Sequence, residues 1–590
     1  MASQADFSTI AELFDASIKR FGPRSLFCVN KGRVWEWTTY AEFGAFVTTF
    51  RNGLHLLGIR HGDRVGIISN NSVEWAAAAY ACYSLGAVFV PMYETQPEKE
   101  WEFILLDCGA KALLVTNGAM YHKVMLHALE DPKRALLCQL QWINPLDSDL
   151  FRSASDASLR SFPPMRPSRE DTACLIYTSG TTGNPKGVVL THGNICSNIA
   201  GVRDLGIVTE EDRSLSFLPW AHAMGHTCEL HGLVHMGATI AICSGVEHLV
   251  TELSEVRPTV LFAVPRIFNK IYNGVRAQME AKPRVVRALF SAGLAAAKKK
   301  RVTGSLGIIE SATLALADRL VFSKIRAKFG GRLRLAISGA AALSPDVAEF
   351  IDALGIKVYE GYGLSETSPI VSANYPGNRK LGSVGKPIPG VRVTIDRSLT
   401  NDPENGEIVV YGPNVMQGYF NRPEETAAAL TRDGGLRTGD LGRVDEDGYI
   451  FITGRIKEQY KLENGKYVVP GPLEEQLKLS PLIANVMVYG DNRPYNVALV
   501  VPDMAGLTAR VSKEGLADAG DLLADERVKK IMMAEIDRLS AEFKGYERIK
   551  KITLAAEDFT QENGMLTPTL KLKRRNVLAK WGEAIERLYE

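Results

Sequence analysis

Apolar and polar positions in the first part of the chain follow helical and strand patterns in turn. Residues 40–57 and the stretch from Val73 carry apolar side chains at helical spacing, whereas residues 64–68 and 87–90 are short apolar runs. Strands that alternate with helices of this length are typical of layered α/β architectures with parallel strand pairing. The first 162 residues therefore predict an α/β fold.

The most apolar stretch, residues 75–90, is where a membrane span could be argued. It is rich in alanine and interrupted by Ser84 and Gly86, and it is shorter than the roughly 20 apolar residues that a span needs. We expect a buried helix that runs into a strand instead. Residues 1–22 are acidic where a secretory signal would be basic, so we expect an amphipathic helix and no export.

Farther along, the pattern predicts more buried strands and one unusual helical segment. Residues 173–177 and 260–263 are short apolar runs, residues 334–338 predict a further strand, and residues 382–442 predict a β-rich region. Residues 275–326 instead place basic side chains among apolar ones at helical spacing, namely Arg284, Arg287, Lys298, Lys299, Lys300 and Arg301. Such helices can lie on anionic membrane surfaces, or they form a helical hairpin with a solvated basic face.

Composition limits the size and class of the protein. A chain of 590 residues is too long for one core, so we expect a large catalytic domain and a smaller one. The net charge of +2 argues neither for nor against a nucleic-acid partner. No Lys/Arg stripe with interleaved aromatic residues supports such a partner. The eight cysteines lie between Cys28 and Cys243 without a C-x-x-C pair, so we expect reduced core residues of an intracellular protein.

The segment from Tyr177 to Gly187, YTSGTTGNPKG, has the residues of a phosphate-binding loop. Its glycines let backbone N–H groups converge on an anion, and its hydroxyls and Lys186 add donors. It follows an expected strand, and open α/β sheets bind ligands at the carboxyl ends of strands. It fits neither the P-loop nor the dinucleotide fingerprint, and a flexible linker is the alternative. The candidate ligands are Thr178, Ser179, Gly180, Thr181, Thr182, Gly183 and Lys186.

This loop resembles the signature of the adenylate-forming superfamily, which includes acyl-CoA synthetases, peptide-synthetase adenylation domains and firefly-type luciferases. Further matching motifs follow in order at residues 215–222, 264–266, 339–341, 357–367, 437–442 and 454–458. The insertion at 275–326 looks like that of the long-chain fatty acid–CoA ligases. The resemblance implies a large N-terminal domain (residues 1–454) of layered α/β sheets with a β-rich subdomain, and a small mobile α+β C-terminal domain (residues 455–590).

The resemblance also implies the nucleotide site. The residues that would border the adenine are Gly339, Ala340, Glu360, Gly361 and Tyr362. Glu366 offers a hard oxygen ligand for Mg²⁺ beside Thr178, and Thr367 offers phosphate a hydroxyl, unless it caps a helix. Asp440 would accept the ribose hydroxyls, unless it caps a turn, and Arg455 would reach the nucleotide.

The acyl, CoA and adenylation residues follow from the same resemblance. His222 would lie beside the acyl pocket and the reacting carboxylate; the alternative is a hydrogen-bonded histidine at a strand end. A metal cluster of His226, His231 and His235 lacks a carboxylate at useful spacing, so we do not expect one. Lys457 is the hinge position, and Lys461 and Gly465 would face the active site during CoA transfer.

The adenylation lysine has two candidates in the C-terminal segment. Alignment on Thr567 gives the role to Lys571, but Leu570 replaces the usual glycine, so Lys573 stays open. A solvated basic tail is the alternative to both.

The resemblance implies an AMP-forming long-chain fatty acid–CoA ligase that uses ATP, Mg²⁺ and CoA. Three alternatives stay open: an acyl-AMP ligase that loads a carrier protein, a medium-chain or aryl acid–CoA ligase, and a non-enzymatic lipid- or nucleotide-binding protein. We expect a cytoplasmic protein, and contact of its basic insertion with the anionic inner face of a membrane stays open. Acyl chain length and a homodimer stay open.

Overall fold

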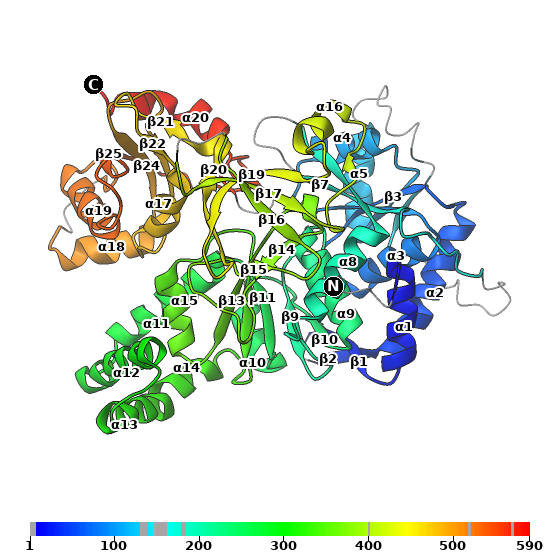
Figure 1. The fold of residues 1–590 in the computed structure, drawn as a ribbon, viewed down its shortest axis with the longest axis horizontal. Coiled ribbons are helices and arrows are strands. Elements are labelled where there is room, and N and C mark those ends of the chain that lie inside the picture. Colours follow the sequence, from blue (N-terminus) through cyan, green and yellow to red (C-terminus); the bar gives the residue numbers. More distant parts are fainter. Residues whose placement is uncertain are drawn as a thin grey trace.

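The computed structural model describes most of the chain. The described residues are 7–32, 34–129, 140, 142–146, 148, 162–178, 184–398, 402–516, 521–567 and 571–590. Five sheets organise them, and Figure 1 shows the small C-terminal part beside a larger body.

A seven-stranded sheet holds the first α/β layer. Its order is β18 (Gly418–Tyr419), β8 (Lys186–Thr191), β7 (Thr172–Thr178), β4 (Val88–Met92), β3 (Arg64–Ile68), β5 (Ala112–Val115) and β6 (Trp142–Pro145). The strands from β7 to β6 pair in parallel, while β8 runs antiparallel to β7. Strands β4 and β5 are buried throughout, as expected of parallel strands covered on both faces.

A nine-stranded sheet forms the second layer. Its order is β15 (Lys386–Pro387), β14 (Ile370–Ala373), β13 (Lys357–Gly363), β12 (Leu335–Ser338), β11 (Val260–Ala263), β9 (Arg213–Ser216), β10 (Thr239–Ile242), β1 (Ser25–Asn30) and β2 (Trp35–Thr39). The predicted strand at 260–263 is confirmed. Strand β13 continues through Gly363 and pairs antiparallel with β14.

Helices fill the space between these two sheets and cover their outer faces. One core joins both sheets to α1 (Ile10–Phe21), α2 (Tyr40–Leu56), α3 (Val73–Ser84), α8 (His192–Arg203), the π-helix η1 (Met224–His231) and α9 (Gly232–Met236). Helices α4 (Glu98–Cys108) and α5 (Gly118–Leu129) cover the outer face of the seven-stranded sheet. The stretch at 75–90 is a buried helix and strand, as predicted, and no described helix is long and apolar enough to cross a bilayer.

The outer face of the nine-stranded sheet carries the basic insertion. The helices on this face are α10 (Leu249–Val256), α11 (Pro265–Glu280), α12 (Arg284–Thr303), α13 (Ile308–Ala317), η2 (Asp318–Phe322), α14 (Ser323–Ala327) and α15 (Pro345–Ala353). Of these, α12, α13 and η2 lie entirely within the insertion at 275–326. In Figure 1, α12 and α13 project from the body as a helical hairpin. The seven described cysteines are free, and five of them are buried.

The predicted β-rich region is a four-stranded antiparallel sheet. Its strands are β16 (Arg392–Asp396), β17 (Gly406–Tyr411), β19 (Leu436–Val444) and β20 (Ile450–Arg455), with η3 (Ser365–Thr367) and α16 (Pro423–Ala429) nearby. The chain then passes through the turn η4 (Ile456–Glu458).

The C-terminal part has its own α+β cores. Its strands are β21 (Tyr460–Lys461), β22 (Tyr467–Val468), β23 (Ile483–Tyr489), β24 (Asn496–Pro502) and β25 (Ile549–Leu554), and its helices are α17 (Pro470–Leu477), α18 (Met504–Lys513), α19 (Glu526–Leu539) and α20 (Arg574–Glu586). The predicted fold class is confirmed.

Candidate active site

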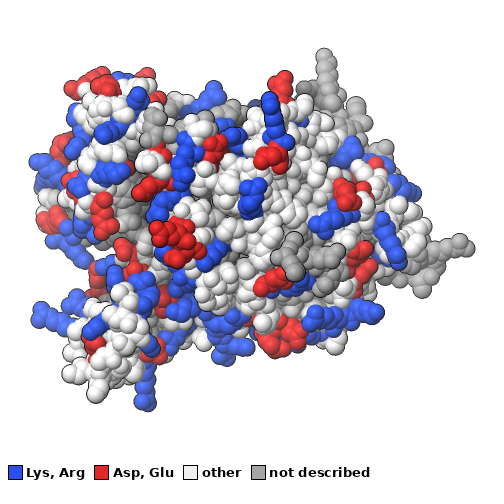
Figure 2. Space-filling view, viewed as in Figure 1, with Lys and Arg blue, Asp and Glu red and all other residues white. Residues whose placement is uncertain are grey.

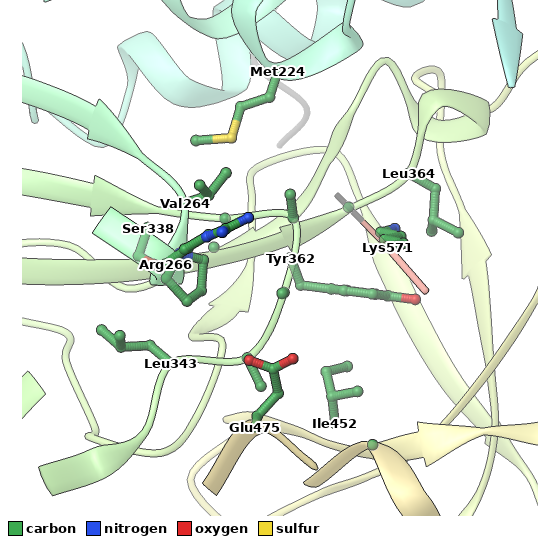
Figure 3. A pocket seen from close by; sticks show the side chains of 18 of the residues that line it. Met224, Val264, Arg266, Ser338, Leu343, Tyr362, Leu364, Ile452, Glu475 and Lys571 are labelled. Carbon is green, nitrogen blue, oxygen red and sulfur yellow. The ribbon is translucent and has the colours of Figure 1, made fainter. Parts of the chain in front are cut away.

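One cavity of about 1750 Å³ gathers most of the predicted site residues (Figure 3). It lies where the carboxyl ends of β7, β12 and β13 meet β19, β20 and the C-terminal part, the position at which α/β sheets bind ligands. The predicted residues that line it are Thr178, Lys186, His222, Gly339, Ala340, Glu360, Gly361, Tyr362, Glu366, Asp440, Arg455, Lys457 and Lys571. Ser179, Gly180, Thr181, Thr182 and Gly183 lie outside the described residues.

A buried carboxylate forms the centre of the polar half of the cavity. Asp440 on β19 faces Arg455 across the β19–β20 pair, and Arg455 Nε lies 2.9 Å from Asp440 Oδ1. The Tyr362 hydroxyl donates to Asp440 Oδ2 at 2.7 Å. Burial, followed by the Asp440 charge, raises the pKa of Tyr362 well above its usual range, so the phenol keeps its proton.

A second acidic group lies on the η3 turn. The Tyr419 hydroxyl donates to Glu366 Oε1 at 2.9 Å. Among the described residues no hydrogen bond reaches the other oxygen, Oε2, which could therefore serve a cation. A carboxylate that lines this cavity suits Mg²⁺, which binds through one or two carboxylates plus substrate phosphates.

Lys186 lies next to this acidic group. Its ammonium is 5.1 Å from the centre of the Tyr419 ring and 4.0 Å from Glu425 Oε1. Lys186 also pairs with Thr178 across the β7–β8 ladder, at the base of the predicted phosphate loop. Tyr419 and Glu425 were not predicted from the sequence, because they reach Lys186 through the long-range pairing of β18 with β8.

Thr367 does not line the cavity. Its hydroxyl is fully buried, accepts from the Leu364 N–H at 3.0 Å and donates to the Pro369 carbonyl. It therefore closes its own turn, which corresponds to the alternative capping role. Glu360 does line the cavity, but burial raises its pKa to about 7, and backbone N–H groups of Leu343 and Gly382 oppose the shift.

His222 begins the apolar half of the cavity. Its Nδ1 accepts from the Met224 N–H at 3.3 Å. Burial, followed by the positive charge of Lys571, lowers the pKa of His222 to about 4, so the imidazole is neutral at neutral pH. A neutral imidazole can share hydrogen bonds with a carboxylate without forming a tight ion pair.

Beyond His222 the lining is apolar and comes mainly from η1, α8, α9 and β11. The residues are Val202, Ile207, Val208, Met224, Cys228, Gly232, Leu233, Met236, Phe262 and Ile337. Gly339 permits the close approach of Met224, since a Cβ at this position would lie 3.0 Å from the Met224 sulfur. In Figure 3, Met224 and Val264 lie to the left of Lys571.

A buried hydrogen-bond network fixes the segment that carries His222. Ser214 and Ser216 donate to Glu229 on η1, at 2.9 and 2.8 Å, and Trp220 Nε1 donates to Ser216 at 3.0 Å. Asn71 accepts from the Trp220 N–H at 2.8 Å. Burial raises the pKa of Glu229 to about 8. Glu229 was not predicted from the sequence, because a charged residue between apolar ones gives no sign of being buried.

The two candidate adenylation lysines occupy different places. Lys571 lies beside the phenol end of Tyr362 (Figure 3), and its backbone pairs with Thr567 at 2.8 and 3.0 Å. Burial, followed by the charge of Arg455, lowers the pKa of Lys571, against attraction by Asp440 and nearby glutamates. Lys573 instead points to the cavity rim, where its ammonium lies 3.7 Å from Glu100 Oε1 on α4.

Two predicted CoA residues lie away from the cavity. Lys461 and Gly465 belong to the β21–β22 hairpin, where the Lys461 ammonium is 5.7 Å from the Tyr467 ring and Gly465 takes a positive φ of 83°. No group of three metal-binding side chains occurs in the described part of the chain. His226 and His231 instead bond to Tyr83 and Tyr80, at 2.8 and 2.9 Å.

The sequence of this chain is similar to those of known proteins. The model for the AMP-binding enzyme family matches residues 14–420, and that for the AMP-binding enzyme C-terminal domain matches residues 457–590. The long-chain-fatty-acid–CoA ligase FadD15 of Mycobacterium bovis is 36% identical over 571 residues, covering 94% of this chain and 93% of that protein. Human long-chain-fatty-acid–CoA ligase 1 is 31% identical over 94% of this chain and 82% of its own length.

Solved structures share the fold. The adenylation domain of a carboxylate reductase from Mycobacterium chelonae superposes with a TM-score of 0.76 at 23% identity, over 98% of this chain and 91% of that one. The anthranilate CoA ligase AuaEII has a TM-score of 0.73 at 20% identity, over 98% of both chains. From the family match and the relatives above 30% identity, the chain belongs to the AMP-binding enzyme family.

Proposed function

We propose that the protein is an ATP-dependent, AMP-forming ligase that joins long-chain fatty acids to CoA. The main support for this proposal is that one cavity contains both the polar cluster around Asp440 and Lys571 and an apolar branch that starts at His222. A nucleotide in the polar half and an acyl chain in the apolar half would bring carboxylate and α-phosphate together near Lys571. Relatives named as long-chain fatty acid–CoA ligases, at 31 to 36% identity, support this choice.

In the first half-reaction the fatty carboxylate attacks the α-phosphorus of ATP, giving acyl-AMP and pyrophosphate. Lys571 would neutralise the charge that develops at the α-phosphate, while Lys186 and residues 178–183 would hold the departing pyrophosphate. Mg²⁺, held through Glu366, would neutralise the triphosphate. Asp440 would exchange part of its present hydrogen bonding for the ribose hydroxyls, with Arg455 and Tyr362 fixing its orientation.

In the second half-reaction the CoA thiol attacks the acyl carbonyl and releases AMP. We propose that residues 455–590 rotate about Lys457 between the two steps. Two placements support this: Lys571 lies in the cavity, whereas Lys461 and Gly465 lie outside it. Rotation would withdraw Lys571 and present the β21–β22 hairpin to the same carbonyl.

The acceptor distinguishes this proposal from its nearest alternative, an acyl-AMP ligase that serves a carrier protein. We would measure pyrophosphate, AMP and thioester with Mg·ATP and acids from acetate to palmitate, plus benzoate, each with and without CoA. Thioester and AMP formed from long acids only with CoA would support the ligase. Pyrophosphate without thioester would favour the carrier-protein alternative, and no product with any acid would refute catalysis.

We also propose peripheral contact between the insertion at 275–326 and an anionic membrane, because long-chain acids partition into bilayers and the insertion is basic. This contact does not depend on the ligase chemistry and has its own test.

A further inference from the structure

Helix α13 exposes an apolar face that the fold does not use. Ile308 and Ile309 are 91% and 82% exposed, and Leu316 is 51% exposed. Isolated exposed apolar residues are ordinary, but these belong to one short helix at the projecting end of the hairpin (Figure 1). Val302, at the end of the neighbouring α12, is also 71% exposed.

The exposed residues form one continuous stripe. At about 100° per residue, Ile308, Ile309, Ala312, Ala315 and Leu316 fall within an arc of about 120°. All five are exposed. The stripe contains no acidic residue.

The opposite side of α13 holds the hairpin together. Leu314 and Ala317 pack into the core of the insertion, and Gly293 on α12 lets Ala317 approach so closely that a Cβ at Gly293 would overlap it. The acidic groups of α13 and η2 are also engaged: Glu310 pairs with Lys299 at 2.6 Å and Asp318 with Arg326 at 2.6 Å. Helix α13 is therefore fixed on one side and free on the apolar side.

Charges around the stripe are mostly positive. Residues 284–322 contain seven Lys or Arg and two Asp or Glu. Lys298 and Arg301 bind Glu349 on α15 and so attach the hairpin to the body. In the described part of the chain, Arg284, Arg287, Lys300 and Arg319 are exposed and form no ion pair. Figure 2 shows the hairpin as a largely uncharged knob with blue side chains, and a few red ones, around it.

We propose that α13 docks in the surface of an anionic lipid bilayer, with its apolar stripe among the acyl chains and the free basic side chains over the headgroups. An apolar stripe without acids, bordered by cations, matches an anionic lipid surface better than a protein partner, which would have to supply an acidic rim. This deepens the proposed membrane contact by naming the face. It also reassigns part of the basic run, since Lys298, Lys299 and Arg301 hold the hairpin in place.

Docking of this face would bring the acyl site close to lipid. Helix α11 leads directly into the hairpin, and its residues Arg266, Asn269 and Asn273 line the cavity. The same short segment of chain thus connects the proposed lipid contact with the cavity.

The test compares wild type with I308S/I309S in co-sedimentation with vesicles of phosphatidylcholine containing phosphatidylglycerol, and with pure phosphatidylcholine. We expect the wild type to bind the anionic vesicles, and to bind them more weakly as the salt concentration rises. The partition coefficient of the double variant on these vesicles should be at least tenfold lower. Val250→Ser is the matched control, since Val250 is 64% exposed on α10, away from the hairpin, and it should bind like wild type.

Lys300→Glu should weaken binding to anionic vesicles and leave the weak binding to pure phosphatidylcholine unchanged. Equal binding by I308S/I309S and wild type, or no binding by wild type, would refute the proposal. Loss of a dimer in the double variant, seen by light scattering, would mean that a second copy covers the face and would also refute it. AMP formation with octanoate, measured without vesicles, should be unchanged in each variant, which keeps this test separate from the ligase proposal.

Discussion

Substitution of Lys571 by alanine should stop the first half-reaction and spare the second. The ammonium of Lys571 lies in the cavity with Asp440, Arg455 and Glu366, and its charge lowers the pKa of His222. The variant removes a positive charge where charge would develop on the α-phosphate. Pyrophosphate formation should therefore fall in the variant, whereas thioester formation from supplied acyl-AMP should not.

The expected size follows from the placement. A unit charge acting at about 4 Å contributes about 4 kcal/mol at an effective dielectric constant near 20. Removal of one preorganised group that stabilises developing charge costs about 2.7–4 kcal/mol, or 10²–10³ in rate. We therefore expect Lys571→Ala to slow adenylation by about 10²–10³.

Lys573→Ala is the matched control. Lys573 lies two residues away, carries the same charge and pairs with Glu100 at 3.7 Å, with both side chains partly exposed. Such a pair contributes at most about 1 kcal/mol, so adenylation should fall by no more than about fivefold. Pyrophosphate exchange measures the first step, and thioester formation from supplied acyl-AMP measures the second.

The pH dependence gives an independent check. Burial and Arg455 lower the pKa of Lys571, so the group loses its proton at a lower pH than an ordinary lysine. If the ammonium is needed, adenylation should decline as pH rises through that lowered pKa, and Lys571→Arg should move the decline to higher pH. Equal loss of both half-reactions, or a larger loss in Lys573→Ala, would refute the assignment.

Three further predictions concern other groups of the site and its support. Tyr362→Phe removes a hydrogen bond to the Asp440 carboxylate that is worth about 1.5–3 kcal/mol, so kcat/KM for ATP should fall by about 10- to 150-fold. Burial raises the pKa of Glu229 to about 8, so between pH 5 and 8 the carboxyl is protonated in the folded state and ionised in the unfolded state, and the free energy of unfolding falls by about 1.4 kcal/mol for each unit that the pH rises. Glu229→Gln should make this fall less steep. An unchanged slope of thermal stability against pH would contradict this. Burial lowers the pKa of His226 to about 3 and that of His231 well below its usual value, so both side chains bind protons only when the protein unfolds. The free energy of unfolding should therefore decrease as the pH drops below about 6.5. Replacement of either histidine by Gln should make this decrease with pH smaller.

Short buried strands were the most predictable parts of the fold. Residues 64–68 and 260–263 coincide with β3 and β11, because a strand covered on both faces is apolar at its buried positions, which are all of β11 and all of β3 after Arg64. Lys186 and Thr178 could also be predicted from local sequence, because a phosphate loop at the end of a strand has a distinctive composition of glycines, hydroxyl residues and a lysine.

Long-range partners could not be predicted in this way. Tyr419 and Glu425 approach Lys186 because the two-residue strand β18 pairs with β8, more than 200 residues earlier in the chain. Nothing in the local pattern identifies so short a strand. Glu229 is a similar case, since only the packing of η1 against β9 supplies the serines that make its burial tolerable.

The insertion illustrates a different limit. Its basic and apolar residues were apparent from the sequence, but periodicity does not reveal which face of a helix will be covered. The structure uses Lys298 and Arg301 to bind Glu349 and leaves Ile308 and Ile309 exposed. The location of the apolar stripe is therefore a property of helix packing, and it shifts the proposed lipid contact from α12 to α13.

The contact between Lys573 and Glu100 has a bearing on the proposed cycle. It joins the C-terminal part to α4, while Lys571 on the same segment lies in the cavity. Each turnover would have to break this contact so that the β21–β22 hairpin could replace Lys571. A partly exposed pair worth at most about 1 kcal/mol can be broken at little cost, whereas a buried pair worth several would hold the enzyme in its adenylation arrangement. The weakness of the pair is thus what a rotating domain requires, and strengthening it by Lys573→Arg should slow thioester formation more than pyrophosphate formation. A change confined to pyrophosphate formation would contradict the rotation.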